Sequence, residues 1–326
     1  MKESLLNLVV CFLISIILSP FLIRWLTKLK FGQSILVYVE KHKTKSGTPT
    51  MGGIIIVLST IIGYFFFIRN NNSLATIALL SLLFFGVLGF LDDFIKIKFK
   101  QNEGLKPYQK IIGQLGISAL IAIFVYMSNM VGSEMYIPFT TKTINVGFWI
   151  IPIVIIFFIA VVNSVNLIDG LDGLCSGVSS VVILALGIII LIINKDVTGV
   201  VSEEMAMLTI ISFGLVGAIL GFLLFNSFPA KVFMGDTGSL AIGGFIATLA
   251  SFSKNYFLVI IIGIAYVLTS LSVIMQVISY KLTKKRIFKM SPLHHHFEHY
   301  YHENKVVWWY VILTFVICVL SIMFYL

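Results

Sequence analysis

The feature that most constrains this chain is a series of long apolar segments, because a helix of about 20 apolar residues spans the hydrocarbon core of a bilayer. Hydrophobic residues make up 59% of the 326 residues and charged residues only 11%, which excludes an ordinary soluble domain. We therefore predict an all-α polytopic integral membrane protein with about ten transmembrane helices, in one domain over residues 1–326. The predicted spans are residues 5–24, 52–68, 74–91, 111–127, 148–164, 177–193, 205–225, 238–252, 255–280 and 306–325.

Basic residues gather on one face of this predicted topology. Of the 23 Lys and Arg residues, 18 fall in the loops of one face, and the other face holds only Lys2, Arg69, Lys142, Lys195 and Lys254. By the positive-inside rule the basic loops are cytoplasmic, so both termini are predicted to be extracytoplasmic.

Two further segments have a predicted structure. Residues 135–139 and 143–146 lie in the longest extracytoplasmic loop, and their alternation predicts a small β-hairpin. The span 255–280 runs without a breaker into a basic sequence that ends at Arg286. We expect one long helix there, with its basic end near anionic head groups.

A polar stretch from Asn163 to Gly173 lies between two apolar runs and carries two Asn and two Asp residues. Polar groups at the end of a membrane span are costly unless they bind something. From these residues alone the stretch is a carboxylate metal loop, a sugar-binding or nucleotide-binding turn, or a connector rich in Asn and Asp.

Other polar motifs lie on the same predicted cytoplasmic face. Adjacent carboxylates at Asp92 and Asp93 repel unless a metal, a proton or a basic partner intervenes, and Lys96 is one helical turn away. Asp236 lies between two glycines before a span, where the alternative is a simple helix N-cap. The sequence His294-His295-His296 suits phosphate or metal binding, and a solvated basic loop is the alternative.

Carboxylates for a hard cation and lysines for phosphate, on one membrane face, together indicate phosphoryl transfer at the membrane surface. A transporter is the alternative from another class, but its site would lie near the bilayer midplane between repeats, and no repeat is visible.

Five motifs, in order, resemble the phospho-N-acetylmuramoyl-pentapeptide transferase family over nearly the whole chain. Ser-Pro-Leu-His-His-His-Phe-Glu distinguishes this branch of the wider polyprenyl-phosphate sugar-1-phosphate transferase superfamily, in which a GlcNAc-1-phosphate transferase is the nearest rival. The motifs are Gly47–Gly53, Leu91–Asp93, Asn163–Gly173, Phe233–Ser239 and Ser291–Glu298.

The resemblance implies transfer of phospho-MurNAc-pentapeptide from UDP-MurNAc-pentapeptide to undecaprenyl phosphate, giving lipid I and UMP. It implies Mg²⁺ as cofactor, bilayer lipids as surroundings, no nucleic acid, and a bacterial cell membrane location with the active site on the cytoplasmic face. A homodimer is left open.

The resemblance also implies residue roles. Asp236 would bind Mg²⁺, with Asp93 and Asp92 near the metal and the attacking phosphate. Direct attack with Asp93 as proton acceptor is preferred over a covalent Asp intermediate. Asn166, Asp169, His295 and His296 would complete the catalytic site. Substrate-binding residues would be Lys45, Lys110, Asn163, Gly170, Leu171, Asp172, Asn226 and Phe233, so the polar stretch is assigned mainly to the uridine nucleotide.

Overall fold

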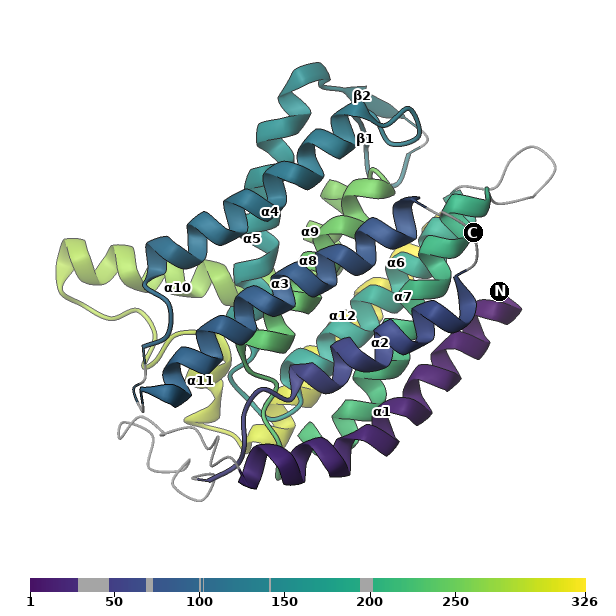
Figure 1. Ribbon diagram of the computed structural model, residues 1–326. Helices are drawn as coiled ribbons and strands as arrows, with labels where there is room; N and C mark the ends of the chain where they lie inside the picture. Colours follow the sequence, from purple (N-terminus) through teal and green to yellow (C-terminus); the bar gives the residue numbers. More distant parts are fainter. Residues whose placement is uncertain (29–46, 69–72, 100, 102, 141, 194–201) are drawn as a thin grey trace.

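The computed structural model describes residues 1–28, 47–68, 73–99, 101, 103–140, 142–193 and 202–326. Long helices run side by side, and a small hairpin lies at the opposite end of the bundle from α11 (Figure 1). The elements are α1 Lys2–Lys28, α2 Gly53–Phe67, α3 Ser73–Lys98, α4 Pro107–Met127, β1 Glu134–Tyr136, β2 Thr143–Asn145, η2 Gly147–Trp149, α5 Ile150–Ile168, α6 Leu174–Ile193, α7 Glu203–Asn226, α8 Gly235–Phe252, α9 Tyr256–Ile262, α10 Ile264–Thr283, α11 Leu293–Glu298 and α12 Glu303–Tyr325.

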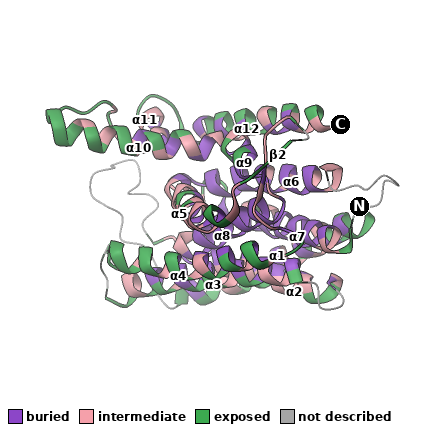
Figure 2. Ribbon diagram, turned by 90° about the horizontal axis from the view of Figure 1, so that it is seen from above, coloured by how far each residue is buried: buried purple, intermediate pink, exposed green. Residues whose placement is uncertain are grey.

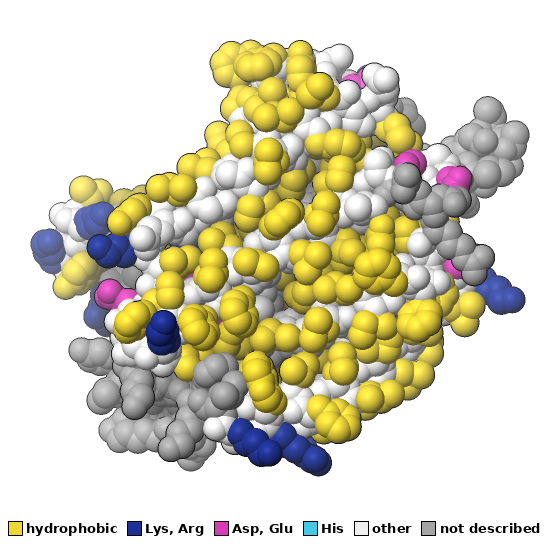
Figure 3. All heavy atoms as spheres, in the orientation of Figure 1, with side chains coloured by type: hydrophobic (Ala, Val, Ile, Leu, Met, Phe, Trp, Pro, Cys, Tyr) yellow, Lys and Arg dark blue, Asp and Glu magenta, His cyan; other side chains and the backbone are white. Residues whose placement is uncertain are grey.

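All ten predicted spans contain helix, and the all-α membrane architecture is confirmed. Within the described ranges, eight helices are long and apolar enough to cross a membrane. The other two predicted spans correspond to α2, with 15 residues, and α8, with 18 residues and several glycines. Hydrophobic side chains cover the flank of the bundle in Figure 3, as expected of a surface that faces lipid.

Helix α8 is the centre of the bundle. Its residues from Thr237 to Phe252 are all buried, and it lies inside the other helices in Figure 2. Glycines permit this packing, because a Cβ on Gly243 would lie 2.7 Å from the Cα of Val162 in α5. A Cβ on Gly244 would collide with Phe85 in α3. The close approach of α3 and α5 brings the polar ends of both helices to the start of α8.

The predicted hairpin is confirmed in a shorter form. Strands β1 and β2 pair antiparallel, with Met135 opposite Ile144. The backbone N–H of Tyr136 donates to the carbonyl oxygen of Lys254 at 2.9 Å, which ties the hairpin to the turn after α8. Both chain termini lie at this end of the bundle (Figure 1).

The prediction of one continuous helix over residues 255–280 is wrong. Gly263 ends α9 and precedes α10, with φ −92° and ψ 26°, outside the helical range. Glycine adopts non-helical conformations more readily than other residues. This backbone also requires glycine, because a Cβ on Gly263 would lie 2.6 Å from the carbonyl oxygen of Val259. Helix α10 therefore leaves the line of α9 and leans away from the bundle (Figures 1 and 2).

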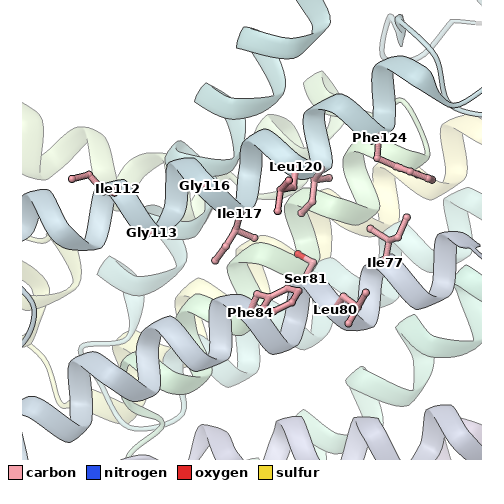
Figure 4. A pocket seen from close by; sticks show the side chains of 11 residues that line it. Ile77, Leu80, Ser81, Phe84, Ile112, Gly113, Gly116, Ile117, Leu120 and Phe124 are labelled. Carbon is pink, nitrogen blue, oxygen red and sulfur yellow. The ribbon is translucent and has the colours of Figure 1, made fainter.

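A groove of about 600 Å³ lies between α3 and α4 (Figure 4). It is lined almost entirely by apolar side chains, with Phe84 and Leu120 on its two walls and Gly116 in the wall of α4. At one end Leu88 packs against Gly113, where a Cβ would lie 2.7 Å from a leucine methyl group. Phe84 and Leu120 are 51% and 71% exposed, so the groove opens on the apolar outer surface of the bundle.

Candidate active site

Asp236, in the first turn of α8, is the centre of a polar cluster. Its Oδ1 accepts a hydrogen bond from Asn166 Nδ2 at 2.8 Å. Its Oδ2 accepts from Lys110 Nζ at 2.9 Å and from Lys96 Nζ at 3.0 Å. The three partners come from the end of α5, the start of α4 and the end of α3. Four helices therefore meet at one carboxylate.

Asp93 holds the start of α8 in place. Its Oδ2 accepts hydrogen bonds from Thr237 N at 2.9 Å and Thr237 Oγ1 at 2.8 Å, and its Oδ1 accepts from Asp236 N at 3.2 Å. The first N–H groups of a helix have no partner within that helix, and the helix dipole favours a negative charge there. Asp93 therefore satisfies these donors from α3, and the side chain of Asp236 is left to face the lysines.

Asp92 completes the acidic group and is 3% exposed. Its Oδ1 accepts from Leu105 N at 2.9 Å, and its Oδ2 lies 2.5 Å from Lys96 Nζ, which confirms the predicted partner of the Asp pair. Gly89, one turn earlier in α3, brings the two helices together, because a Cβ there would collide with the carbonyl oxygen of Asp236.

The three carboxylates form a candidate metal centre. One ligand atom each from Asp92, Asp93 and Asp236 lie within 4.8 Å of one another. Lys96 Nζ lies 2.5, 4.0 and 3.0 Å from oxygens of these three residues, so a positive charge already sits where they converge. Carboxylate oxygens are preferred ligands of hard divalent cations, and the donor set fits such an ion.

Asn166 links the acidic group to its surroundings. Its Nδ2 donates to Ser239 Oγ at 2.8 Å as well as to Asp236, and its Oδ1 accepts from Lys110 Nζ at 3.2 Å. The amide therefore fixes the positions of a carboxylate and an ammonium group at the same time.

Asp169 follows the last residue of α5 and carries a perturbed carboxyl group. Burial, and then the negative charges of Asp236, Asp93 and Asp172, raise the pKa of Asp169 to about 8. Its charge therefore depends on what positive charge enters the cluster.

Asn163 lies one turn before Asn166 and pairs with a neighbouring helix. Its Nδ2 donates to Gln114 Oε1 at 2.7 Å, and Gln114 Nε2 donates to Asn163 Oδ1 at 3.3 Å. Gln114 is fully buried and lies one turn after Lys110 in α4. The amide pair and the hydrogen bond between Lys110 and Asn166 thus join α4 to α5 at two successive helical turns.

The turn after α5 is fixed by contacts with distant elements. Asp172 and Leu171 are both 4% exposed. Asp172 Oδ2 accepts from Ala230 N at 3.0 Å, and the N–H of Asp172 donates to Glu303 Oε1 at 2.7 Å. The predicted nucleotide segment is therefore anchored to α12 and to the loop after α7.

Asn226 and Phe233 organise the loop between α7 and α8. Asn226 Nδ2 donates to the carbonyl oxygen of Val232 at 3.0 Å. Phe233 pairs by its backbone with the segment before α2, since its N–H donates to Pro49 O and its carbonyl accepts from Gly52 N, both at 2.8 Å. The Thr-Pro-Thr-Met-Gly-Gly motif is thereby held at the start of α8.

The histidine motif forms the short helix α11. His295 Nδ1 lies 3.0 Å from Glu298 Oε2, and His296 Nδ1 accepts from Lys289 N at 3.2 Å. His294 is fully buried and lies against Gly170, where a Cβ would collide with its Nε2. Burial, and then the neighbouring His295, lower the pKa of His294, so this imidazole is neutral.

The structure brings together five of the sequence-predicted residues in one hydrogen-bonded cluster, Asp92, Asp93, Asp236, Asn166 and Lys110. The buried turn, the α7–α8 loop and the histidine helix make the separate contacts described above, and Lys45 lies outside the described residues.

Sequence reasoning did not select Gln114, and it gave Lys96 only as a partner of the Asp pair. It included His294 in the histidine motif but assigned individual roles only to His295 and His296. Gln114 offered a signal, because it is a polar residue inside an apolar span, four positions after Lys110. The choice among three consecutive histidines depends on how α11 packs, and the sequence carries no signal for it.

Comparisons with known proteins give two family matches. Residues 75–254 match the model of glycosyl transferase family 4, and residues 45–57 match phospho-N-acetylmuramoyl-pentapeptide-transferase signature 1.

Curated relatives carry the name phospho-N-acetylmuramoyl-pentapeptide-transferase. One from Halalkalibacterium halodurans is 48% identical over 90% of this chain and 88% of the relative. One from Clostridium novyi is 43% identical over 90% and 88%, and one from Clostridioides difficile is 44% identical over 88% and 86%.

Proposed function

The chain belongs to the phospho-N-acetylmuramoyl-pentapeptide-transferase family, and from this premise we propose how its polar cluster carries out the reaction. The protein is a phosphoglycosyl transferase of peptidoglycan synthesis, embedded in a bacterial membrane. We propose UDP-MurNAc-pentapeptide and undecaprenyl phosphate as its substrates, with lipid I and UMP as products.

The observation that carries the proposal is the cluster around Asp236. Three carboxylates and two lysines meet at the ends of membrane helices, where Lys110 and Lys96 both lie within 3.0 Å of the same carboxylate oxygen. A lipid phosphate reaches such a site from the bilayer, and a nucleotide reaches it from the adjoining aqueous phase. Phosphoryl transfer depends mainly on positioning and on offsetting negative charge, and these side chains supply both.

The acidic group is also the proposed Mg²⁺ site. Asp236 is the first candidate ligand, with Asp92 and Asp93 beside it. A divalent cation held there would offset the negative charge of the diphosphate. Lys96 lies among the same three carboxylates, so it would share their negative charge with a bound ion.

The proposed reaction is a direct displacement. An oxygen of the lipid phosphate attacks the phosphorus bonded to the sugar, a new P–O bond forms, and the P–O bond to UMP breaks. If the lipid phosphate enters with a proton, we propose, as from the sequence, that Asp93 accepts that proton. The hydrogen bonds from Thr237 and Asp236 to Asp93 add a second role, which is to hold α8 and its Asp236 in position.

Replacing Asp93 by Asn separates these two roles. A phosphate monoester has a second pKa of about 6, so the attacking phosphate needs no base at higher pH. If Asp93 acts mainly as a base, turnover of D93N recovers as pH rises. If it mainly positions α8, turnover stays low at every pH. Near-normal turnover of D93N below the phosphate pKa as well as above it would contradict both roles.

The nucleotide is proposed to lie against the buried turn and the loop before α8. Gly170, Leu171, Asp172, Asn226 and Phe233 are the proposed contacts, with Lys45 as a further phosphate contact. Asn166 and Asp169 would face the reacting phosphates, and His295 and His296 the phosphate or sugar. His294 adds an imidazole whose two nitrogens have no hydrogen-bond partner among the described residues.

The proposed orientation puts the cluster in the cytoplasm and both termini outside. The three natural cysteines are buried, so single introduced cysteines can be labelled selectively. The test uses a membrane-impermeant maleimide on cells whose cell membrane is intact and whose outer layers have been made permeable. We expect Lys142→Cys, near the hairpin, to react in these cells, and Lys98→Cys to react only after lysis. The reverse pattern would contradict this orientation.

The experiment that tests the function is release of UMP by the purified protein. With undecaprenyl phosphate and Mg²⁺, UDP-MurNAc-pentapeptide should give UMP and a lipid-linked product. UDP-GlcNAc should not do so, and turnover of UDP-GlcNAc alone would favour the rival transferase. A burst of UMP without the lipid acceptor would instead favour the covalent mechanism.

A further inference from the structure

Helix α10 ends in a cationic tip that projects from the bundle. The helix leans away from its neighbours, and its far end lies at the same end of the molecule as α11 (Figures 1 and 2). Along its length Leu271, Ile274 and Ile278 are about half exposed, at 46%, 52% and 52%. The lean of α10 therefore carries its tip sideways into the region that lipid occupies around the bundle.

Five basic side chains define what we call the α10 tip. The sequence has no Asp or Glu between Asp236 and Glu298, so the charge of this region is uniformly positive. In the part of the chain that the structure describes, none of the five forms an ion pair. Dark blue spheres mark this end of α10 at the left of Figure 3, next to hydrophobic ones. The α10 tip consists of Lys281, Lys284, Lys285, Arg286 and Lys289, all exposed.

A folded return segment, residues 284–292, presents most of these charges. Gln276 Oε1 accepts hydrogen bonds from Ile287 N and Phe288 N, both at 3.0 Å, and Gln276 Nε2 donates to Phe288 O at 2.9 Å. Ser279 Oγ donates to Lys285 O at 2.9 Å. The return segment is thus held against α10 by hydrogen bonds, and most of the basic side chains of the α10 tip extend from it.

We propose that the α10 tip is a binding site for the head groups of anionic phospholipids. Leu282 and Ile287 lie between the basic residues and are 79% and 51% exposed, which gives the tip apolar side chains for the acyl boundary. Interleaved apolar and cationic side chains at the depth of the head groups favour a lipid surface over a soluble polyanion, because a soluble partner leaves the apolar side chains in water.

The α10 tip is connected to the histidine helix. The N–H of Lys289 donates to His296 Nδ1 at 3.2 Å, and Lys289 Nζ lies 4.2 Å from the centre of the Tyr300 ring. Leu293 N donates to Ser272 Oγ at 2.9 Å, which returns the chain to α10. A head group bound at the tip therefore stabilises the segment that leads directly into α11.

Lipid binding is measured without reference to catalysis. Leu282→Cys is labelled with bimane, which is selective because the natural cysteines are buried. The protein is placed in phosphatidylcholine nanodiscs that contain a small, fixed fraction of spin-labelled phosphatidylglycerol or spin-labelled phosphatidylcholine. Clustered Lys and Arg side chains at the membrane surface attract anionic lipid, so we expect quenching by phosphatidylglycerol to exceed quenching by phosphatidylcholine severalfold. Equal quenching by the two lipids overturns the proposal.

Variants make the result specific. Quenching by the two spin-labelled lipids should become equal in the triple variant Lys284→Gln, Lys285→Gln and Arg286→Gln. The preference for phosphatidylglycerol should remain in the charge-conserving variant Lys284→Arg with Lys285→Arg. The matched control neutralises Arg24 and Lys28, two exposed basic residues at the same end of α1, and should leave the α10 signal unchanged. If the triple variant keeps the preference, or the α1 control removes it, the site is not at the α10 tip. A preference abolished by soluble polyphosphate at constant ionic strength would assign the tip to a soluble polyanion.

Discussion

The amide pair between Gln114 and Asn163 gives a prediction that separates positioning from substrate contact. The pair joins α4 to α5 through two hydrogen bonds, of 2.7 and 3.3 Å, next to the contact between Lys110 and Asn166. Asn163→Leu removes one amide and leaves the buried Gln114 without its partner. A buried polar group left unpaired costs about 1–3 kcal/mol.

The size of the coupling follows from the environment. Side-chain hydrogen bonds between membrane helices average about 0.6 kcal/mol and reach about 1.7 kcal/mol. We expect Asn163→Leu and Gln114→Leu each to lower the free energy of unfolding in detergent, and the double variant to lose less than the sum by about 1 kcal/mol. Turnover should fall with each single change, because a shift of about 1 Å in a positioning group can cost on the order of 100-fold in rate.

The assay combines equilibrium unfolding with steady-state kinetics on the same four proteins. Unfolding effects that add without coupling would show that the pair does not act as a unit. A rise in KM for the nucleotide in Asn163→Leu alone, with unchanged stability and normal Gln114→Leu, would instead support the sequence-based prediction that Asn163 contacts the substrate.

Three further predictions follow from other contacts. Gly89→Ala should lower turnover on the order of 100-fold, because its Cβ meets the backbone of Asp236, while Gly116→Ala, with open space around its Cβ, should be silent; equal activities would refute the close packing. In metal-free protein, the raised pKa of Asp169 means that the folded state binds more protons than the unfolded state between pH 3.8 and about 8. Stability should therefore fall as pH rises through this window, by up to about 1.4 kcal/mol per pH unit, and Asp169→Asn should flatten the slope; an unchanged slope in thermal melts would contradict this cause. The three buried cysteines should react with a maleimide only after unfolding, and rapid labelling of native protein would contradict their packing.

The architecture was largely predictable, because each membrane span requires a local run of about 20 apolar residues that is visible in the sequence. Long apolar runs located the apolar helices, although α9 and α10 were predicted as one span, and the acidic residues at the helix ends located the polar cluster. The pairing of Asp92 with Lys96 was also accessible, since both lie on one helix at a spacing of four residues.

The remaining features depend on contacts between distant segments. Gly263 stands alone in an apolar run, and glycine is common inside membrane helices, so the break between α9 and α10 had no distinct signal. Asp93 satisfies the start of α8 across 144 residues of sequence, and the partner of Asn163 lies 49 residues away. Such pairings follow from how the helices pack, which no local pattern specifies.

The carboxylates around Asp236 are proposed to hold the metal ion, which together with Lys96 and Lys110 would hold the reacting phosphates. The most direct test of this proposal is UMP release from UDP-MurNAc-pentapeptide and undecaprenyl phosphate across a Mg²⁺ titration, for the wild type and for Asp236→Asn of matched thermal stability. We expect UMP release to require Mg²⁺ in the wild type and to be lost at every Mg²⁺ concentration in the variant. Full turnover by Asp236→Asn, or release by the wild type in excess chelator, would contradict it.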